Sequence, residues 1–162
     1  MLVRNVINHI RGVARLGEGP DWLMGPVVLR WAETVERITL ADDSDLPQWE
    51  VGGRLRMAPL LEALDGIVGG SLPSRILLLS DGHWALSDVQ DFKKWKRSQP
   101  GVSVRSLSIG PDAVRSVLAK VSDGGSFPAE DVVPAIASWP RASDGLLNLP
   151  RVVGDLSVGD LR

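Results

Sequence analysis

The chain has 162 residues, of which 44% are hydrophobic and 23% are charged, and its formal net charge is -2. These values are ordinary for one globular domain, too apolar for a disordered chain, and give no basic field that would attract nucleic acid or an anionic membrane. The absence of cysteine excludes disulfides, thiolate catalysis and cysteine-based zinc sites. Because the start lacks the pattern of a signal peptide and no apolar run approaches ~20 residues, we expect a cytoplasmic protein.

The first third of the chain contains a helical pattern followed by two strand patterns. Apolar residues recur at helical spacing from Leu2 to Val13 and predict a helix that ends near Leu16. After a loop rich in Gly and Pro, the apolar run 27–32 and the alternating run 35–40 predict a hairpin whose second arm lies at the sheet edge. We interpret the acidic segment that follows as a solvated loop, because its carboxylates do not have the spacing of an EF-hand.

The segment Arg-Ile-Leu-Leu-Leu-Ser-Asp-Gly at 75–82 is the strongest signal in the chain. An unbroken apolar run between turn residues is typical of a central parallel strand that helices cover on both faces. The carboxyl ends of parallel strands usually carry the functional sites of such sheets. Ser80, Asp81 and His83 are therefore expected at the rim of the sheet.

Helices and strands alternate along the rest of the chain. The patterns predict helices at 59–68, from Ser87 or Asp88 to the Pro100-Gly101 break, from Pro111 to about 123 and from about Ala129 to 139, with strands at 102–109 and 125–127. This alternation predicts a three-layer α/β/α fold with a mostly parallel sheet and one antiparallel edge strand. We expect a domain at residues 1–140 and a tail or linker at 141–162.

Four segments together resemble the von Willebrand factor A (VWA) family. They are Gly52-Gly53 ahead of the apolar helix at 60–64, Ile76 to Gly82, Val102 to Gly110, and Gly124-Gly125-Ser126-Phe127. The resemblance covers about residues 1 to 139 and is nearest to the bacterial CoxE-like group, whose members often work beside MoxR-type AAA+ ATPases. It implies a Rossmann-like sheet, a role in protein binding, and a MoxR-type ATPase as a candidate partner.

The resemblance also implies where a metal site would lie. In the VWA family an Asp-x-Ser-x-Ser motif after the first strand, a Thr in a later loop and an Asp after the fourth strand hold Mg²⁺ or a similar hard cation. Asp81 falls on the last of these positions, whereas Arg54 falls on the Thr position and cannot ligate a cation. Since Asp-x-Ser-x-Ser is also missing, we expect no metal cofactor, and we hypothesise that Arg54 pairs with Asp81 where the cation would stand.

The strand that would carry Asp-x-Ser-x-Ser is expected to be missing as well. In the family's sheet this first strand lies between the strands that correspond to 27–32 and 76–79. Its loss would leave backbone groups on both neighbours without partners, unless the two strands close up or another chain adds a strand. The tail from Leu146 to Arg162 is apolar enough to be a candidate filler.

The sequence therefore predicts a non-catalytic protein-interaction module with a degenerate metal site, and no enzyme. The expected partner-binding rim consists of Arg54, Ser80, Asp81, His83 and Trp84. No phosphate-binding loop, dinucleotide fingerprint or telling pair of carboxylates is present. A first alternative is half of a metal-dependent VWA domain that binds Mg²⁺ when another chain completes it. A second alternative is a small hydrolase using Ser80, Asp81 and His83, although residues crowded on one turn rarely form a triad and no Gly-x-Ser-x-Gly elbow is present.

The tail carries a near-repeat, Val-Gly-Asp-Leu at 153–156 and again at 158–161. A period of five residues fits neither a helix nor a strand, and the glycines favour flexibility. The tail is either a frayed terminus or a docking segment. We hypothesise that it docks onto a partner through Leu156 and Leu161.

Overall fold

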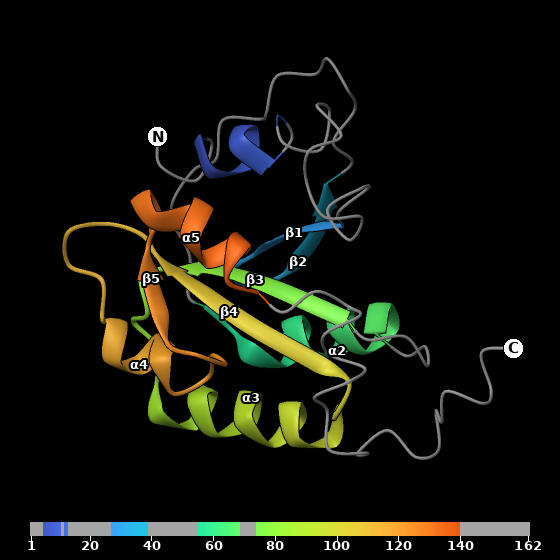
Figure 1. Ribbon diagram of the computed structural model, residues 1–162. Helices are drawn as coiled ribbons and strands as arrows, with labels where there is room; N and C mark the ends of the chain where they lie inside the picture. Colours follow the sequence, from blue (N-terminus) through green and yellow to red (C-terminus); the bar gives the residue numbers. More distant parts are fainter. Residues whose placement is uncertain (1–4, 11, 13–26, 39–54, 69–73, 140–162) are drawn as a thin grey trace, which may run out of the picture.

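The computed structural model of the chain is a mixed α/β fold with a three-stranded parallel sheet and a separate two-stranded antiparallel sheet (Figure 1). It describes residues 5–10, 12, 27–38, 55–68 and 74–139. The elements are a helical segment at 5–10 and 12, β1 (Val28–Trp31), β2 (Val35–Ile38), α2 (Met57–Val68), β3 (Ser74–Ser80), α3 (Leu86–Ser98), β4 (Val102–Ser108), α4 (Arg115–Ala119), β5 (Ser126–Pro128), a 3-10 turn (Ala129–Asp131) and α5 (Val132–Ala137). Within these ranges, no helix has both the length and the hydropathy needed to cross a bilayer.

The parallel sheet has the order β3, β4, β5. β3 and β4 pair along their full length, with Ile76 opposite Val104. The shorter β5 pairs with the end of β4, where Ser106 lies opposite Ser126. The prediction of a parallel strand at 75–82 is confirmed, but its central position is not. In the described sheet β4 is the middle strand and is buried at all but one residue, whereas most of β3 is only half-buried.

The predicted hairpin is confirmed as β1 and β2, which pair antiparallel with Val28 opposite Ile38 and Trp31 opposite Val35. It forms a sheet of its own and does not extend the parallel sheet as an antiparallel edge strand. Leu29, Trp31 and Val35 attach it to the rest of the molecule by packing against the core. The N–H of Arg56 also donates to the carbonyl of Ala32 at 3.1 Å. Among the described residues, the hairpin is therefore held by side chains and this single backbone bond, and it shares no hydrogen-bond ladder with the parallel sheet.

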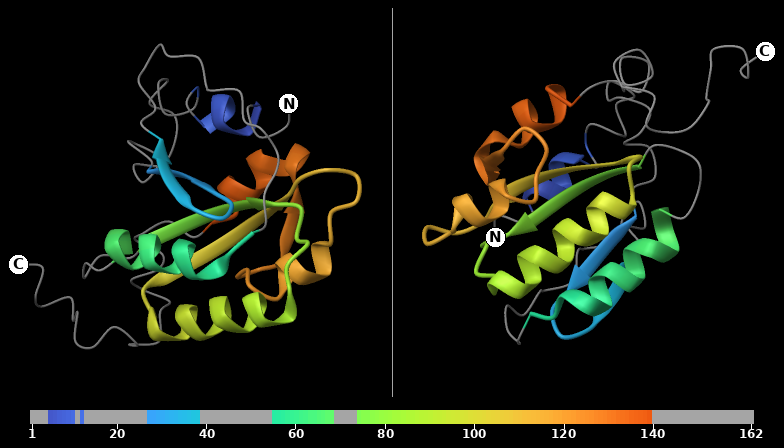
Figure 2. Two further views of the ribbon diagram at one scale, coloured as in Figure 1. Left: turned by 180° about the vertical axis from the view of Figure 1, so that it is seen from behind. Right: turned by 90° about the horizontal axis from the view of Figure 1, so that it is seen from below.

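Two apolar clusters lie on opposite faces of the parallel sheet. Alternate residues of β3 join them, since Ile76 and Leu78 belong to one cluster and Leu77 and Leu79 to the other. The α3-side cluster takes its helical residues from α2, α3 and the region of α4, and the α5-side cluster takes them from α5 and the N-terminal helical segment. Figures 1 and 2 show these two groups of helices on the two sides of the sheet.

The helix boundaries follow local hydrogen bonds. Pro59 lies in the first turn of α2, as predicted, although the helix begins two residues earlier at Met57. The prediction that Ser87 or Asp88 is the N-cap of α3 is wrong, because Ala85 is the N-cap and Asp88 reaches back from the first turn to accept its N–H at 3.3 Å. Such a reverse bond stabilises a helix start as a cap does.

The helix predicted from Pro111 is shorter than expected, because α4 begins only at Arg115. The N–H of Val114 donates to the carbonyl of Asp81 at 2.7 Å, and Val114 has the non-helical angles φ -88 and ψ 76. Residues 111–114 are therefore a loop that is tied to the end of β3.

Arg105 fastens α5 to β4. Its guanidinium donates to the carbonyl of Ala135 at 2.7 Å and to the carbonyl of Ser138 at 2.8 Å. It also lies 5.5 Å from the ring centroids of Phe127 and Trp139. Burial lowers the pKa of Arg105, and the nearby carboxylate of Asp123 acts in the opposite direction. The sequence did not predict that Arg105 would connect the strand to the helix, because its position within a strand pattern does not indicate its partners.

Candidate functional site

Ser80 ends β3 and anchors the turn that follows it. Its Oγ accepts a hydrogen bond from the N–H of Gly82 and another from Nε1 of Trp84, each at 3.1 Å. Trp84 is buried and meets Trp31 edge to face, with ring centroids 5.5 Å apart. The sequence placed Trp84 on the partner-binding rim, but its ring lies in the α3-side cluster and joins the hairpin to the core.

Gly82 lets the same turn pass close to the loop before α4. Its φ is 76°, in the left-handed region that favours glycine, and a Cβ there would lie 2.6 Å from the carbonyl oxygen of Val114. Together with the bond from Val114 to Asp81, this contact fixes the backbone of the turn. The side chains of Asp81 and His83 are thus presented from a rigid support.

Asp81 and His83 point to solvent beside each other. Oδ1 of Asp81 accepts the N–H of His83 at 3.0 Å, and Oδ2 lies 3.5 Å from Nδ1 of the same residue. The side chains of His83 and Asp81 are 56% and 58% exposed. Both residues follow the carboxyl end of β3 and are accessible to a partner, while their predicted role in binding stays a prediction.

The structure does not bring Ser80 and His83 together. Oγ of Ser80 is occupied by the indole of Trp84, and the ring of His83 lies against Asp81. A serine nucleophile needs contact with its base, and the base needs a third group to orient it. Here the acid and the imidazole are neighbours on the surface, while the hydroxyl serves as a structural acceptor.

A metal site has little support from the described side chains. Arg54 lies outside the described residues, so its predicted pairing with Asp81 stays a prediction. Within the ranges that the structure describes, no three His, Cys, Asp or Glu side chains come together as a possible metal site. Among the described residues, His83 is the potential ligand that lies beside Asp81.

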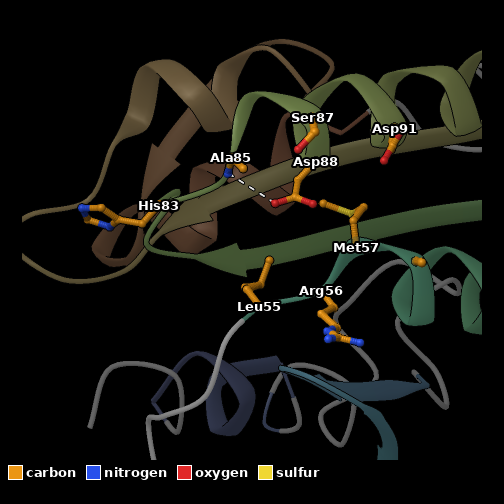
Figure 3. Close-up of a pocket in the computed structure, with 9 residues that line it drawn as sticks. Leu55, Arg56, Met57, His83, Ala85, Ser87, Asp88 and Asp91 are labelled. Carbon is orange, nitrogen blue, oxygen red and sulfur yellow. Dashed lines mark hydrogen bonds between the residues drawn. The ribbon is translucent and has the colours of Figure 1, made fainter.

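A hollow of about 490 Å³ opens between the starts of α2 and α3 (Figure 3). Its lining mixes apolar and charged side chains, namely Leu55, Arg56, Met57, Ala58, His83, Ala85, Ser87, Asp88 and Asp91. In Figure 3, His83 lies at one end of the hollow and Asp88 points toward Met57. Leu86, between two lining residues, is 69% exposed. We call Asp81, His83, Leu86 and this hollow the rim surface.

The sequence named Asp81 and His83 as rim residues, and their role in binding stays a prediction; it did not point to Leu86 or to the hollow. Leu86 precedes the helix that the sequence predicts from Ser87 or Asp88, and only its position before the buried stripe of α3 could have marked it as exposed. The predicted docking residues Leu156 and Leu161 lie outside the described residues.

Comparison with family models, with curated proteins and with solved structures finds no match for this chain.

Proposed function

We propose that this chain is a non-catalytic protein-interaction module of VWA type that presents the rim surface to a protein partner. The observation that carries the proposal is the combination of an exposed leucine, carboxylate and imidazole around an open hollow. Protein interfaces typically join an apolar anchor to a polar surround in this way. A rigid turn supports the side chains, so binding costs little ordering of the backbone.

The arrangement of elements supports the VWA interpretation. Helices lie on both faces of a parallel sheet, which is the basis for proposing a three-layer α/β/α domain. The Ser-Asp-Gly segment lies at the carboxyl end of β3, and Gly124 and Gly125 precede β5 with φ values of 82° and 93°. Both placements are those that the resemblance implies.

The identity of the partner is an extrapolation from the resemblance. A MoxR-type AAA+ ATPase in the bacterial cytoplasm is the candidate, with Leu156 and Leu161 of the tail as a second point of contact. The hydrolase alternative has less support, because Ser80 hydrogen bonds to Trp84 and not to His83. The metal-dependent alternative would require ligands beyond the described neighbours of Asp81.

The experiment is affinity capture from a lysate of the source organism, followed by mass spectrometry. The full chain is compared with Leu86→Asp and with a matched control, Ile67→Asp, because Ile67 is also exposed, at 41%, but lies at the opposite end of α2 from the hollow. We expect one partner to be recovered with the unaltered chain and with Ile67→Asp, but not with Leu86→Asp. Equal recovery by all three would overturn the rim surface as the binding site.

A further inference from the structure

The outer edge of β3 carries backbone groups that face away from β4. The N–H of Ser74 donates to Gly101 at 3.0 Å, and the carbonyl of Ser80 accepts from Ile109 at 3.0 Å. The direction of the backbone N–H and C=O groups alternates along a strand. Those of the even-numbered residues of β3 therefore point toward β4, and those of Leu77 and Leu79 point toward the opposite, outer edge. No strand in the described part of the chain pairs with that edge.

This edge is unlike the ordinary edge of a sheet. Leu77 and Leu79 are half-buried leucines in the unbroken apolar run 76–79, and no proline lies in the strand. The one charged residue of β3, Arg75, lies near its start and leaves the edge at Leu77 and Leu79 without a charge. By contrast, where β4 extends beyond β5, Asp123 covers it: its carboxylate accepts the N–H of Val104 at 2.9 Å, and its own N–H donates to the carbonyl of Val104 at 2.6 Å. The edge of β3 is thus built for another strand.

The chain topology indicates where that strand comes from. From β3 through α3 to β4 and through α4 to β5, both helices pack on the α3-side cluster, whereas α5 packs on the opposite face. Connections between parallel strands are almost always right-handed. A helix on the opposite face therefore leads the chain back across the sheet, past β4, to the outer edge of β3.

The end of α5 lies at the end of the sheet where the parallel strands begin. Nε1 of Trp139 donates to Oγ of Ser103 at 2.9 Å, and Ser103 is the second residue of β4. The register pairs the start of β3 with the start of β4. The chain thus leaves α5 where a strand parallel to β3 would begin.

The sequence after Trp139 contains a fitting segment. Leu-Leu-Asn-Leu at 146–149 follows a six-residue stretch, 140–145, and precedes Pro150, which would end a strand. Six extended residues span ~20 Å, and two strand spacings, the distance from β4 to the added strand, are ~10 Å. Loops of up to about six residues commonly connect a helix to the next strand.

We propose that residues 146–149 add to the outer edge of β3 as a parallel strand and pair with the backbone of Leu77 and Leu79. Figures 1 and 2 show the β1 and β2 hairpin on this same side of β3, so the added strand would lie between the two sheets. The proposal concerns the fold of the chain and does not depend on the function proposed for the rim surface.

Amide hydrogen exchange of the full chain, followed by NMR, tests the proposal residue by residue. If β3 pairs with β4 alone, the amides of Ile76 and Leu78 are protected and the amides of Leu77 and Leu79 exchange quickly. We expect all four to be protected. Leu147→Pro should speed exchange at Leu77 and Leu79 at least about tenfold and leave Leu78 protected, because only the outer ladder is lost. The control Leu156→Pro, in the same tail, should change none of them.

Fast exchange of Leu77 and Leu79 in the unaltered chain would overturn the proposal. Slow exchange that Leu147→Pro does not affect would also overturn it, and would assign the edge to a second copy if protection depends on protein concentration. Nuclear Overhauser contacts between the backbone of 146–149 and that of Leu77 or Leu79 test the pairing without any variant. Their presence supports the added strand, and their absence contradicts it.

Discussion

Ser80 accepts two hydrogen bonds at the carboxyl end of β3, and we predict that its role is structural. Ser80→Ala leaves the indole N–H of the buried Trp84 without its acceptor, which should lower the free energy of unfolding by about 1 kcal/mol. Ser87→Ala is the matched control, because Ser87 is exposed on the adjacent turn. Urea denaturation of both variants is the measurement. Equal stability of the two would mean that the bond to Trp84 contributes nothing.

Arg105 combines charge, burial and several acceptors, so its loss should be costly. Arg105→Met keeps most of the side-chain volume but leaves the carbonyls of Ala135 and Ser138 without a donor, and we predict a loss of roughly 2 to 4 kcal/mol. Arg115→Met removes one exposed hydrogen bond, to the carbonyl of Ser126, and should cost less than about 1 kcal/mol. Thermal or urea unfolding would show the difference. A smaller loss for Arg105→Met than for Arg115→Met contradicts the role of Arg105.

Single residues at the end of β3 could be placed from the sequence only in part. The Ser-Asp-Gly turn after an apolar run correctly located Asp81 and His83 on the surface, because the turn chemistry is local. The burial of Trp84 depends on Trp31, a residue far away in the sequence, and a local pattern does not contain that contact. Arg105 was missed for the same reason, since its acceptors lie on α5.

At the scale of elements, the turn between β3 and α3 depends on Gly82. We predict that Gly82→Ala lowers the free energy of unfolding by about 2 kcal/mol or more, because the left-handed backbone and the approach to Val114 both exclude a Cβ. Gly66→Ala is the opposite case, since Gly66 lies inside α2 with nothing within 4 Å of an added Cβ. It should stabilise the protein by up to about 1 kcal/mol. Thermal unfolding that moves both variants in the same direction would contradict this account.

Most elements were predictable because each has its own periodicity. The apolar runs gave β1 and β3, the alternating run gave β2, the spaced apolar residues from Val102 gave β4, and the stripe of Val89, Phe92 and Trp95 gave α3. The boundaries that differ are those set by tertiary contacts. α4 begins late because Val114 is hydrogen bonded to Asp81, and Ala85 precedes α3 as its N-cap because Asp88 supplies the bond from inside the helix.

For the whole molecule, we predict no binding of Mg²⁺ or Mn²⁺ at physiological concentrations. A hard dication requires several oxygen ligands, and among the described side chains Asp81 is accompanied only by His83. Isothermal calorimetry of the unaltered chain and of Asp81→Ala is the measurement. A dissociation constant well below a millimolar that disappears in Asp81→Ala would restore the metal-dependent alternative.

The way the sheets assemble could not be predicted from the chain alone. Apolar content identified β3 as a strand covered on both faces, but hydrophobicity does not say which strands pair with it. In the described part of the chain, β3 pairs with β4, and the hairpin forms a sheet of its own. Pairing between strands far apart in sequence is a property of the whole molecule, whereas the pattern within each strand is local.

The most direct test of the proposed function is the affinity of the purified partner for three forms of the full chain. Calorimetry would compare the unaltered chain with Leu86→Asp and Ile67→Asp, two exposed apolar positions at opposite ends of the helical layer. Loss of an apolar anchor at the centre of an interface costs about 2 kcal/mol or more, so Leu86→Asp should raise Kd at least about tenfold. Ile67→Asp should leave Kd within about twofold. An unchanged Kd for Leu86→Asp, or an equal loss for both variants, would contradict the rim surface as the binding site.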